Sequence, residues 1–388
     1  MIRELSVPPL MRVGGGALNE VADVVKTLGA ARPLIVTDGF LVSVGVAQRV
    51  IDALAADGVQ AALFDGVVPD PTSASLEAGL EVLRQHDADL LIGLGGGSPI
   101  DTAKALAVLA VRGGAMRELK APLRYDGPAL ALLAVPTTAG TGSEATQFTV
   151  ITDSETGEKM LCMGPSFLPR AAIIDFELTL SMPPRLSADT GIDALTHAVE
   201  AYVSGRRNRF SDALALYAIR TIGANLRTVY HRGEDRDARA AMMEAATYAG
   251  IAFSNSSVAL VHGMSRPIGA HFHVAHGMAN AMLFADVTEF SLGVDDARYA
   301  DCARALGVAT SEASDAEAAA ALVSELHALK TELAVPTPEV FGVSREDWER
   351  AVPVMAQQAI ASGSHLNNPR VPTAEEIEAL YRKIYSAG

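Results

Sequence analysis

Residues 89–111 read DLLIGLGGGSPIDTAKALAVLAV, and this stretch gives the strongest indication of the fold. Its first part, 89–94, has the length of a buried strand, and after Asp89 it is an unbroken apolar run. A glycine run follows. Pro99 then stands near the first turn of a helical stretch over 99–111, where its missing N–H does no harm. A strand that turns on glycines into a helix is typical of βαβ units around a parallel sheet.

The sequence on both sides of this stretch alternates in the same way. The predicted strands are 33–37, 61–64 and 129–135, and the predicted helices are 42–54 and 73–85. Near-continuous apolar strands separated by helices indicate a sheet that is buried on both faces. We therefore predict an α/β domain over residues 1–183.

The pattern changes after Pro183-Pro184, where β-branched runs become rare and apolar residues recur at helical spacing. One such face carries Leu214, Ile219, Ile222 and Leu226. Similar segments are 235–253, 296–306, 314–332, 345–361 and 374–386. The start of the last segment, at Thr373 and Glu376, fits a capping box. We predict an all-helical second domain over residues 184–388.

Composition and charge narrow the class of function. The chain has 388 residues, 49% of them hydrophobic, which is enough for a large core. With 31 Lys and Arg against 46 Asp and Glu, its formal net charge of −15 argues against binding to nucleic acid or to an anionic membrane surface. Its two cysteines cannot form a disulfide framework, and no signal peptide or spanning apolar run is recognisable. We expect a cytoplasmic protein that acts on a small molecule.

The glycine run is a candidate phosphate-binding turn. Glycines allow backbone N–H groups to approach a phosphate, and the helix that follows adds its partial positive charge. Ser98 stands where a dinucleotide fingerprint has its last glycine, and the usual acidic residue about 20 positions later is missing. The alternative is a plain turn that needs positive φ angles.

Two further segments at strand ends suit a dinucleotide. Asp38 follows the strand 34–37, where a carboxylate can accept ribose hydroxyls and repel a 2′-phosphate, which favours NAD over NADP. The loop 136–144, PTTAGTGSE, is dense in small hydroxyl residues and follows the strand that ends at Val135. A turn aspartate and a solvated loop are the respective alternatives.

One aspartate and three of the nine histidines form a candidate metal site. Asp193 and His197 are four residues apart on a predicted helix, so their side chains share one face. His262 and His276 are 14 residues apart in a second histidine-rich region. One carboxylate with three imidazoles suits Fe(II) or Zn. The alternatives are an ordinary helix pair and a solvated histidine-rich turn.

Together these motifs resemble the iron-containing (group III) alcohol dehydrogenase family, and the resemblance extends along nearly the whole chain. The matching stretches are 95–104, 136–144, 191–200, 260–264, 276–281 and 368–370. The resemblance implies a dinucleotide-binding α/β domain followed by an all-helical domain, the architecture also found in dehydroquinate synthase. It further implies metal-assisted hydride transfer between NAD(H) and a small primary alcohol, diol or ω-hydroxy acid, or the matching aldehyde.

The resemblance also implies site residues. The metal ligands would be Asp193, His197, His262 and His276. The NAD(P) contacts would be Asp38, Gly96, Gly97, Ser98, Asp101, Thr137, Thr138, Thr141 and Lys159. We expect Fe(II) with Zn as the alternative, NAD rather than NADP, and a homodimer, as in many relatives.

Departures from the family pattern keep alternatives open. Many relatives have a second histidine four residues after the position of His262, and this chain has Arg266 there. Arg266 would bind a substrate carboxylate, or else pair with a structural acid or the cofactor phosphate. The proton relay would then lie elsewhere, with His273 as the candidate. The competing functions are a dehydroquinate synthase type of lyase, a maleylacetate reductase-like reductase of an anionic substrate, and a noncatalytic binding module.

Overall fold

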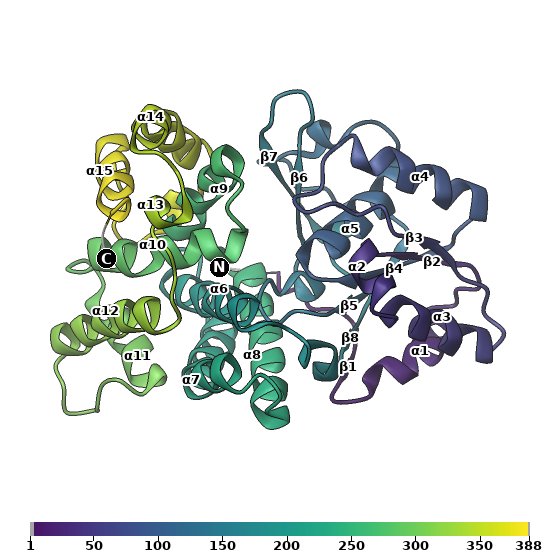
Figure 1. Cartoon of the computed structure of the whole chain (residues 1–388), viewed down its shortest axis with the longest axis horizontal. Coiled ribbons are helices and arrows are strands. Elements are labelled where there is room, and N and C mark those ends of the chain that lie inside the picture. The colour runs from purple at the N-terminus through teal and green to yellow at the C-terminus, as the bar shows by residue number, and fades with distance from the viewer. Residues whose placement is uncertain (1–3, 387–388) are drawn as a thin grey trace. The chain divides into compact units, whose positions relative to one another are not determined.

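The computed structural model describes residues 4–386, and the chain divides into two compact units, Met1–Ser181 and Met182–Gly388. The first unit is built around a parallel sheet (Figure 1). The sheet has the strand order β1-β8-β5-β4-β2-β3, and every neighbouring pair in it is parallel. Its strands are β1 (Leu10–Val13), β2 (Pro33–Val36), β3 (Ala62–Phe64), β4 (Leu90–Gly95), β5 (Ala131–Pro136) and β8 (Ala171–Ile174). The predicted α/β domain is confirmed.

Side chains alternate along the strands, so both faces of the sheet are covered. In β2, Leu34 and Val36 belong to one core, which contains residues of the helices α4 (Ser75–His86) and α5 (Gly97–Arg112). Ile35 belongs to the opposite core, with residues of α1 (Val21–Thr27) and α3 (Val46–Ala56). Because neither face meets water, the strands are continuously apolar, as the sequence indicated.

Some elements differ from the sequence prediction. The single helix predicted over 42–54 is wrong, because the chain forms α2 (Gly39–Ser43) and then α3, separated by Gly45 with φ 80°. This left-handed conformation suits glycine and interrupts a helix. The strands β1 and β8, the helix α1 and the antiparallel ribbon of β6 (Phe148–Thr152) and β7 (Lys159–Met163) were not predicted.

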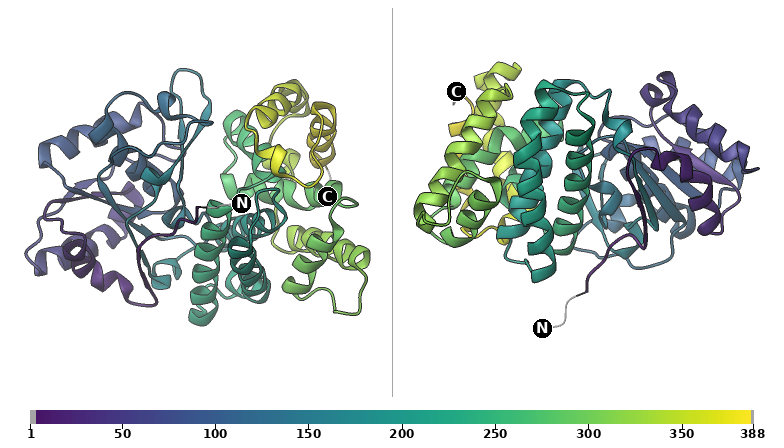
Figure 2. Two further views of the ribbon diagram at one scale, coloured as in Figure 1. Left: turned by 180° about the vertical axis from the view of Figure 1, so that it is seen from behind. Right: turned by 90° about the horizontal axis from the view of Figure 1, so that it is seen from below.

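Every regular element among residues 182–386 is a helix (Figure 2). The longer ones are α6 (Pro184–Val203), α7 (Arg209–His231), α8 (Arg236–Asn255), α9 (Leu260–Phe272), α10 (His276–Ser291), α11 (Asp296–Leu306), α12 (Asp315–Glu332), α14 (Arg345–Ala361) and α15 (Ala374–Ile384), and α13 (Pro338–Phe341) is a single turn. The predicted all-helical region and the capping box of Thr373 with Glu376 are confirmed. Within residues 4–386 we find no helix that meets the length and hydrophobicity needed to cross a bilayer.

The helix α6 lies in the interior of the second unit, packed against α7, α8 and α10. Every residue from Ser187 to Val203 is buried. Polar side chains on such a helix need partners, because an unpaired buried polar group is costly. The buried polar residues of α6 include Asp193, His197 and Glu200, which belong to the candidate site.

Candidate functional site

Three helices bring Asp193, His197, His262 and His276 together, and we call these four residues the tetrad. One ligand-type atom from each lies within 4.8 Å of all the others. Oδ1 of Asp193 is 3.6 Å from His262 Nε2 and 3.8 Å from both His276 Nε2 and His197 Nδ1. Two ligands about 2.1 Å from a shared ion in tetrahedral geometry lie roughly 3.4 Å apart. The spacing is therefore close to that of a metal site.

The local structure explains why the four side chains meet. Asp193 and His197 are one turn apart on α6, and His262 lies near the start of α9. His276 is the first residue of α10, and the next residue, Gly277, lies directly against α6. A Cβ atom at Gly277 would stand 2.5 Å from the carbonyl oxygen of Asp189. Only glycine therefore lets α10 begin so close to Asp193.

Glu200 holds the imidazole of His262. Its Oε2 is 2.6 Å from His262 Nδ1, and the same carboxylate accepts the backbone N–H groups of Ala259 and Val261. With Nδ1 bonded to the carboxylate, Nε2 faces Asp193. A carboxylate behind a ligand histidine is the usual outer partner in metal sites. Glu200 was not predicted as a site residue, although its place three residues after His197 puts it on the same helical face.

Asn280 offers a test of whether these residues suit a cation. Its Nδ2 lies 2.6 Å from Asp193 Oδ1, 3.1 Å from His262 Nε2 and 3.2 Å from His276 Nε2. An N–H donor thus faces three acceptors that converge on one point, as a cation would. The donor set of one carboxylate and three imidazoles fits a divalent transition metal. Asn280 was also missed from the sequence, although it follows His276 by one turn.

The charges in the tetrad are strongly coupled. Burial acts to raise the pKa of Asp193, but the nearby charges of His197, His276 and His262 outweigh it, so the pKa lies below its usual range. Burial acts to lower the pKa of His262, and Glu200 and Asp193 reverse this to a raised value. The carboxylate is therefore held in its charged form, which is the form that binds a metal.

In the first unit, the glycine turn (residues 95–98) and the threonine loop (residues 136–144) lie against each other. Gly95 ends β4 with φ 146°, and Gly96 caps the long helix α5. A Cβ atom at Gly96 would contact Thr138 at 3.4 Å, and one at Gly97 would approach Thr141 at 3.1 Å. Thr137 donates its N–H to the Gly95 carbonyl. Ser98 lies in the first turn of α5, so the structure brings these predicted cofactor residues to one end of the sheet.

Asp38 and Lys159 already have protein partners. The Oδ1 atom of Asp38 accepts the Leu41 N–H and so caps α2 at the carboxyl end of β2. The ammonium of Lys159 lies 2.8 Å from Asp70 Oδ1. Both residues lie near the ends of strands or loops in the first unit. Each side chain already bonds to the protein, so a ligand would not be its sole partner.

Asp101 points into the protein. Its two carboxylate oxygens accept the Ser143 hydroxyl at 2.7 Å and the Val150 N–H at 2.9 Å. Burial raises its pKa, although Lys104 opposes the shift. Lys104 donates to both oxygens of Thr146 and to the Phe148 carbonyl. Asp101 and Lys104 therefore join α5 to the β6–β7 region.

Arg266, which departs from the family pattern, lies on α9, and His273, the candidate proton relay, lies at the end of this helix. Arg266 is half-buried, and its Nη1 donates to the Ser364 hydroxyl at 3.3 Å. His273 ends α9 in a left-handed conformation with φ 55°, and its side chain is exposed.

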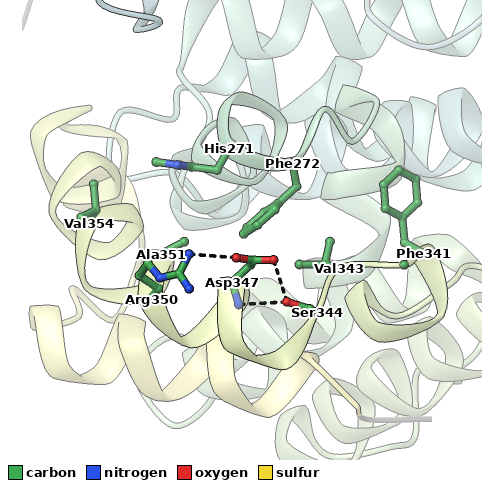
Figure 3. A pocket seen from close by; sticks show the side chains of 10 residues that line it. His271, Phe272, Phe341, Val343, Ser344, Asp347, Arg350, Ala351 and Val354 are labelled. Carbon is green, nitrogen blue, oxygen red and sulfur yellow. Dashed lines mark hydrogen bonds and ion pairs between the residues drawn. The ribbon is translucent and has the colours of Figure 1, made fainter.

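Two other features of the helical unit are distinct from the tetrad. A cavity of 560 Å³ lies between the end of α9 and the segment leading into α14, and none of the tetrad lines it (Figure 3). Three of its polar residues bond to each other, because Asp347 accepts from Ser344 and Arg350, and His271 bonds to Gln358. A second acidic and histidine group, Asp286, Glu289 and His327, already has a cation, the ammonium of Lys383, paired with both carboxylates.

The fold and the tetrad define a class, an α/β unit with a glycine turn followed by a helical unit with a metal-type cluster. Known sequences agree with it. The profile described as "Iron-containing alcohol dehydrogenase" matches residues 8–176, and "Fe-containing alcohol dehydrogenase family, C-terminal" matches residues 187–385. The chain belongs to the iron-containing alcohol dehydrogenase family.

Named relatives span almost the full length. Lactaldehyde reductase of Escherichia coli (strain K12) is 40% identical, over 95% of this chain and 96% of its own. NAD-dependent methanol dehydrogenase of Bacillus methanolicus is 36% identical, over 97% and 98%. The crystal structure of a 1,3-propanediol oxidoreductase has a TM-score of 0.95 and 34% identity, covering 99% of this chain and 100% of that one. The protein is an oxidoreductase of alcohols or aldehydes.

Proposed function

We propose that the protein interconverts a small alcohol and its aldehyde with NAD(H), using one divalent metal held by Asp193, His197, His262 and His276. The observation that carries this proposal is the meeting of one carboxylate and three imidazoles at less than 4.8 Å, with Glu200 behind His262. Asp193, His197 and His262 are almost fully shielded from water, whereas His276 is 39% exposed on its side chain. Only one side of the tetrad is therefore open to a substrate.

The residues of the chain have separate tasks in this reaction. Asp193 supplies the negative charge that balances a cation, and Glu200 fixes the His262 ring and keeps its Nε2 lone pair on the tetrad. When bound, a divalent ion supplies Lewis acidity that polarises a carbonyl or favours deprotonation of an alcohol. Burial of the tetrad strengthens each of these electrostatic effects, because little water screens them.

For the cofactor, we propose that the glycine turn and the threonine loop bind the pyrophosphate of NAD(H). Backbone N–H groups at Gly96, Gly97 and Ser98 stand at the start of a 16-residue helix, which favours a phosphate. Thr137, Thr138 and Thr141 add hydroxyl groups beside the turn. Asp38 has a second carboxylate oxygen for a ribose hydroxyl, and its charge favours NAD over NADP. Lys159 and Asp101 would act at the edge of this site, the latter by holding the loop through Ser143.

The identity of the metal and the proton relay are proposed on general chemical grounds. We propose Fe(II) as the metal, with Zn as the competitor, because this donor set binds either and supply decides occupancy. His273, exposed at the end of α9, is the proposed proton relay. The homodimer and the cytoplasmic location stay predictions, as does the placing of the domain boundary between residues 183 and 184.

Two alternative functions would use the same architecture. A lyase of the dehydroquinate synthase type would use NAD and a metal on this architecture, but its phosphorylated substrate needs a basic pocket. Arg266 is the one arginine or lysine on α9, the helix that carries His262. That single cation favours the second alternative, a reductase of an anionic substrate similar to maleylacetate reductase.

The test is a spectroscopic assay of net hydride transfer. Protein loaded with Fe(II) or Zn is mixed with NADH and a panel of aldehydes, ketones and oxo acids, and the loss of reduced nicotinamide absorbance is followed. We expect oxidation of NADH with at least one small aldehyde or oxo acid. If no carbonyl compound in the panel causes NADH oxidation with either metal, the proposed function is wrong.

A further inference from the structure

Arg266 lies on the same helix and the same face as a residue of the tetrad. It follows His262 by four positions in α9, one turn and about 6 Å along the helix axis. The helix also packs on the turn that bears Ser364, because a Cβ atom at Gly263 would lie 3.6 Å from Ser364 Cβ. The side chain of Arg266 reaches the same turn, because its Nη1 lies 3.3 Å from Ser364 Oγ.

The guanidinium of Arg266 is poorly satisfied. Its interaction within the described residues is one hydrogen bond, from Nη1 to Ser364 Oγ at 3.3 Å, and no carboxylate of residues 4–386 is ion-paired with it. Arg239, another buried arginine, donates from Nε, Nη1 and Nη2 to three different acceptors. A half-buried cation without a counter-charge is unusual, because buried charges are normally paired.

The nearest acid does not fill this role. Glu200 acts on Arg266 through its charge, but its carboxylate already accepts from Ala259, Val261 and His262. Burial lowers the pKa of Arg266, with Glu200 opposing the shift, and a guanidinium still stays charged at physiological pH. The turn beside it holds a second unsatisfied group, because Nδ1 of the buried His365 has no hydrogen-bond partner among the described residues.

We infer that Arg266 binds a carboxylate on the substrate itself, so that the substrates are short oxo acids and the corresponding hydroxy acids. The inference rests on the proposed function, because it assigns the second functional group of the molecule that is reduced. A guanidinium fork matches the two oxygens of a carboxylate and binds it more specifically than a point charge does. The single turn between His262 and Arg266 favours a carboxylate only a few carbons from the carbonyl.

Paired substrates test this assignment. The metal-loaded wild type is assayed with ω-oxo acids of two to five carbons, each compared with the unbranched neutral aldehyde of the same carbon number. We expect kcat/KM to be at least about tenfold higher for one oxo acid than for its neutral partner. Replacing Arg266 by Met should lower kcat/KM for that oxo acid by about 10- to 100-fold and change the neutral aldehyde by less than about threefold. Arg266→Lys should fall between, and Arg382→Met on α15 is the control.

A binding measurement separates recognition from turnover. Butyrate carries a carboxylate and no reducible carbonyl, and its dissociation constant is measured by calorimetry on the wild type, Arg266→Met and Arg266→Lys. We expect the wild type to bind butyrate most tightly and Arg266→Met most weakly. Circular dichroism checks that each variant is folded. If Arg266→Met does not fold, the preference of the wild type for oxo acids over neutral aldehydes decides whether the site recognises a carboxylate.

The outcomes distinguish this inference from the proposed function. No preference of the wild type for any oxo acid, or an equal loss by Arg266→Met on both substrates of a pair, overturns the role of Arg266 but leaves the dehydrogenase. A higher KM for NADH with unchanged aldehyde discrimination assigns Arg266 to the cofactor and also overturns it. If no carbonyl compound causes NADH oxidation but butyrate still binds through Arg266, the proposed hydride transfer is refuted instead.

Discussion

The carboxylate of Glu200 lies 2.6 Å from Nδ1 of His262, and it also accepts two backbone N–H groups at the start of α9. One side chain of α6 thereby fixes both the beginning of a neighbouring helix and the ring of a candidate metal ligand. The arrangement keeps Nδ1 protonated and directs Nε2 to Asp193, 3.6 Å away. Glu200 is therefore a positioning residue for the tetrad.

Replacing Glu200 by Gln should weaken metal binding without removing a ligand. Loss of the negative charge makes the His262 ring a poorer donor, and outer partners of this kind are typically worth about 10- to 100-fold in metal affinity. The measurement is a competition titration with a chelator. Glu346→Gln, at an exposed position of α14, should leave the affinity unchanged. An affinity of Glu200→Gln equal to that of the wild type contradicts the role of the carboxylate.

Gly277→Ala should disturb the tetrad through the backbone. The new Cβ atom would stand 2.5 Å from the Asp189 carbonyl oxygen, so α10 must move away from α6 and take His276 with it. We expect a loss of about 1–3 kcal/mol in unfolding free energy, measured with urea, together with weaker metal binding. Gly263→Ala is the matched control, because its Cβ atom meets nothing closer than 3.5 Å. Equal behaviour of the two variants would refute the close approach.

Asp38→Asn should relax the choice of cofactor. Asparagine caps a helix as well as aspartate does, so the bond to the Leu41 N–H is kept while the charge is removed. Without repulsion of a 2′-phosphate, the KM for NADPH should fall by about tenfold or more, and the KM for NADH should change little. Steady-state kinetics with both cofactors measure this. A wild type that already uses NADPH as well as NADH argues against a selective role for Asp38.

Lys104 should make the unfolding free energy of the protein depend on pH in the alkaline range. Burial lowers its pKa from 10.5 to about 8, against the opposing charges of Asp101 and Glu144. Between these two values the unfolded chain binds more protons than the folded one, so the unfolding free energy rises with pH. Lys104→Met should be less stable by about 1–3 kcal/mol at pH 7, because the buried oxygens of Thr146 and Phe148 lose their donor.

The difference in unfolding free energy between wild type and Lys104→Met should therefore widen from pH 8 toward pH 10.5. Urea titrations of both proteins at several pH values check this. Because the other alkaline groups are common to both proteins, they cancel in the comparison. A difference that stays constant or narrows over this range would show that the native pKa of Lys104 is not depressed.

Helical periodicity accounts for what could be predicted of the site. Asp193 and His197 are readable as a pair because they are four residues apart on one helix, and the family motifs add His262 and His276. Glu200 and Asn280 were missed, although each lies one turn from a tetrad residue. Their partners are on other helices, and only the packing of α6, α9 and α10 shows which bonds they make.

The first unit shows the same division between local and long-range information. Buried strands such as β4 follow from apolar runs, but the break between α2 and α3 depends on the left-handed φ of Gly45, which an apolar pattern does not contain. The motif that includes Asp101 suggested a cofactor contact. That contact stays a prediction, and the structure adds what the motif did not indicate: both oxygens of Asp101 accept hydrogen bonds, from Ser143 and Val150, in segments more than 40 residues away.

Whether the tetrad holds the metal that the reaction needs is tested by measuring metal content and activity on the same samples. Wild type, Asp193→Asn and His262→Ala are loaded with Fe(II), freed of excess ion, and assayed for bound metal by elemental analysis and for NADH oxidation with the best carbonyl substrate. We expect one metal ion per wild-type chain, activity in proportion to bound metal, and neither metal nor turnover in His262→Ala. Full turnover of metal-free protein, or of His262→Ala, would contradict it.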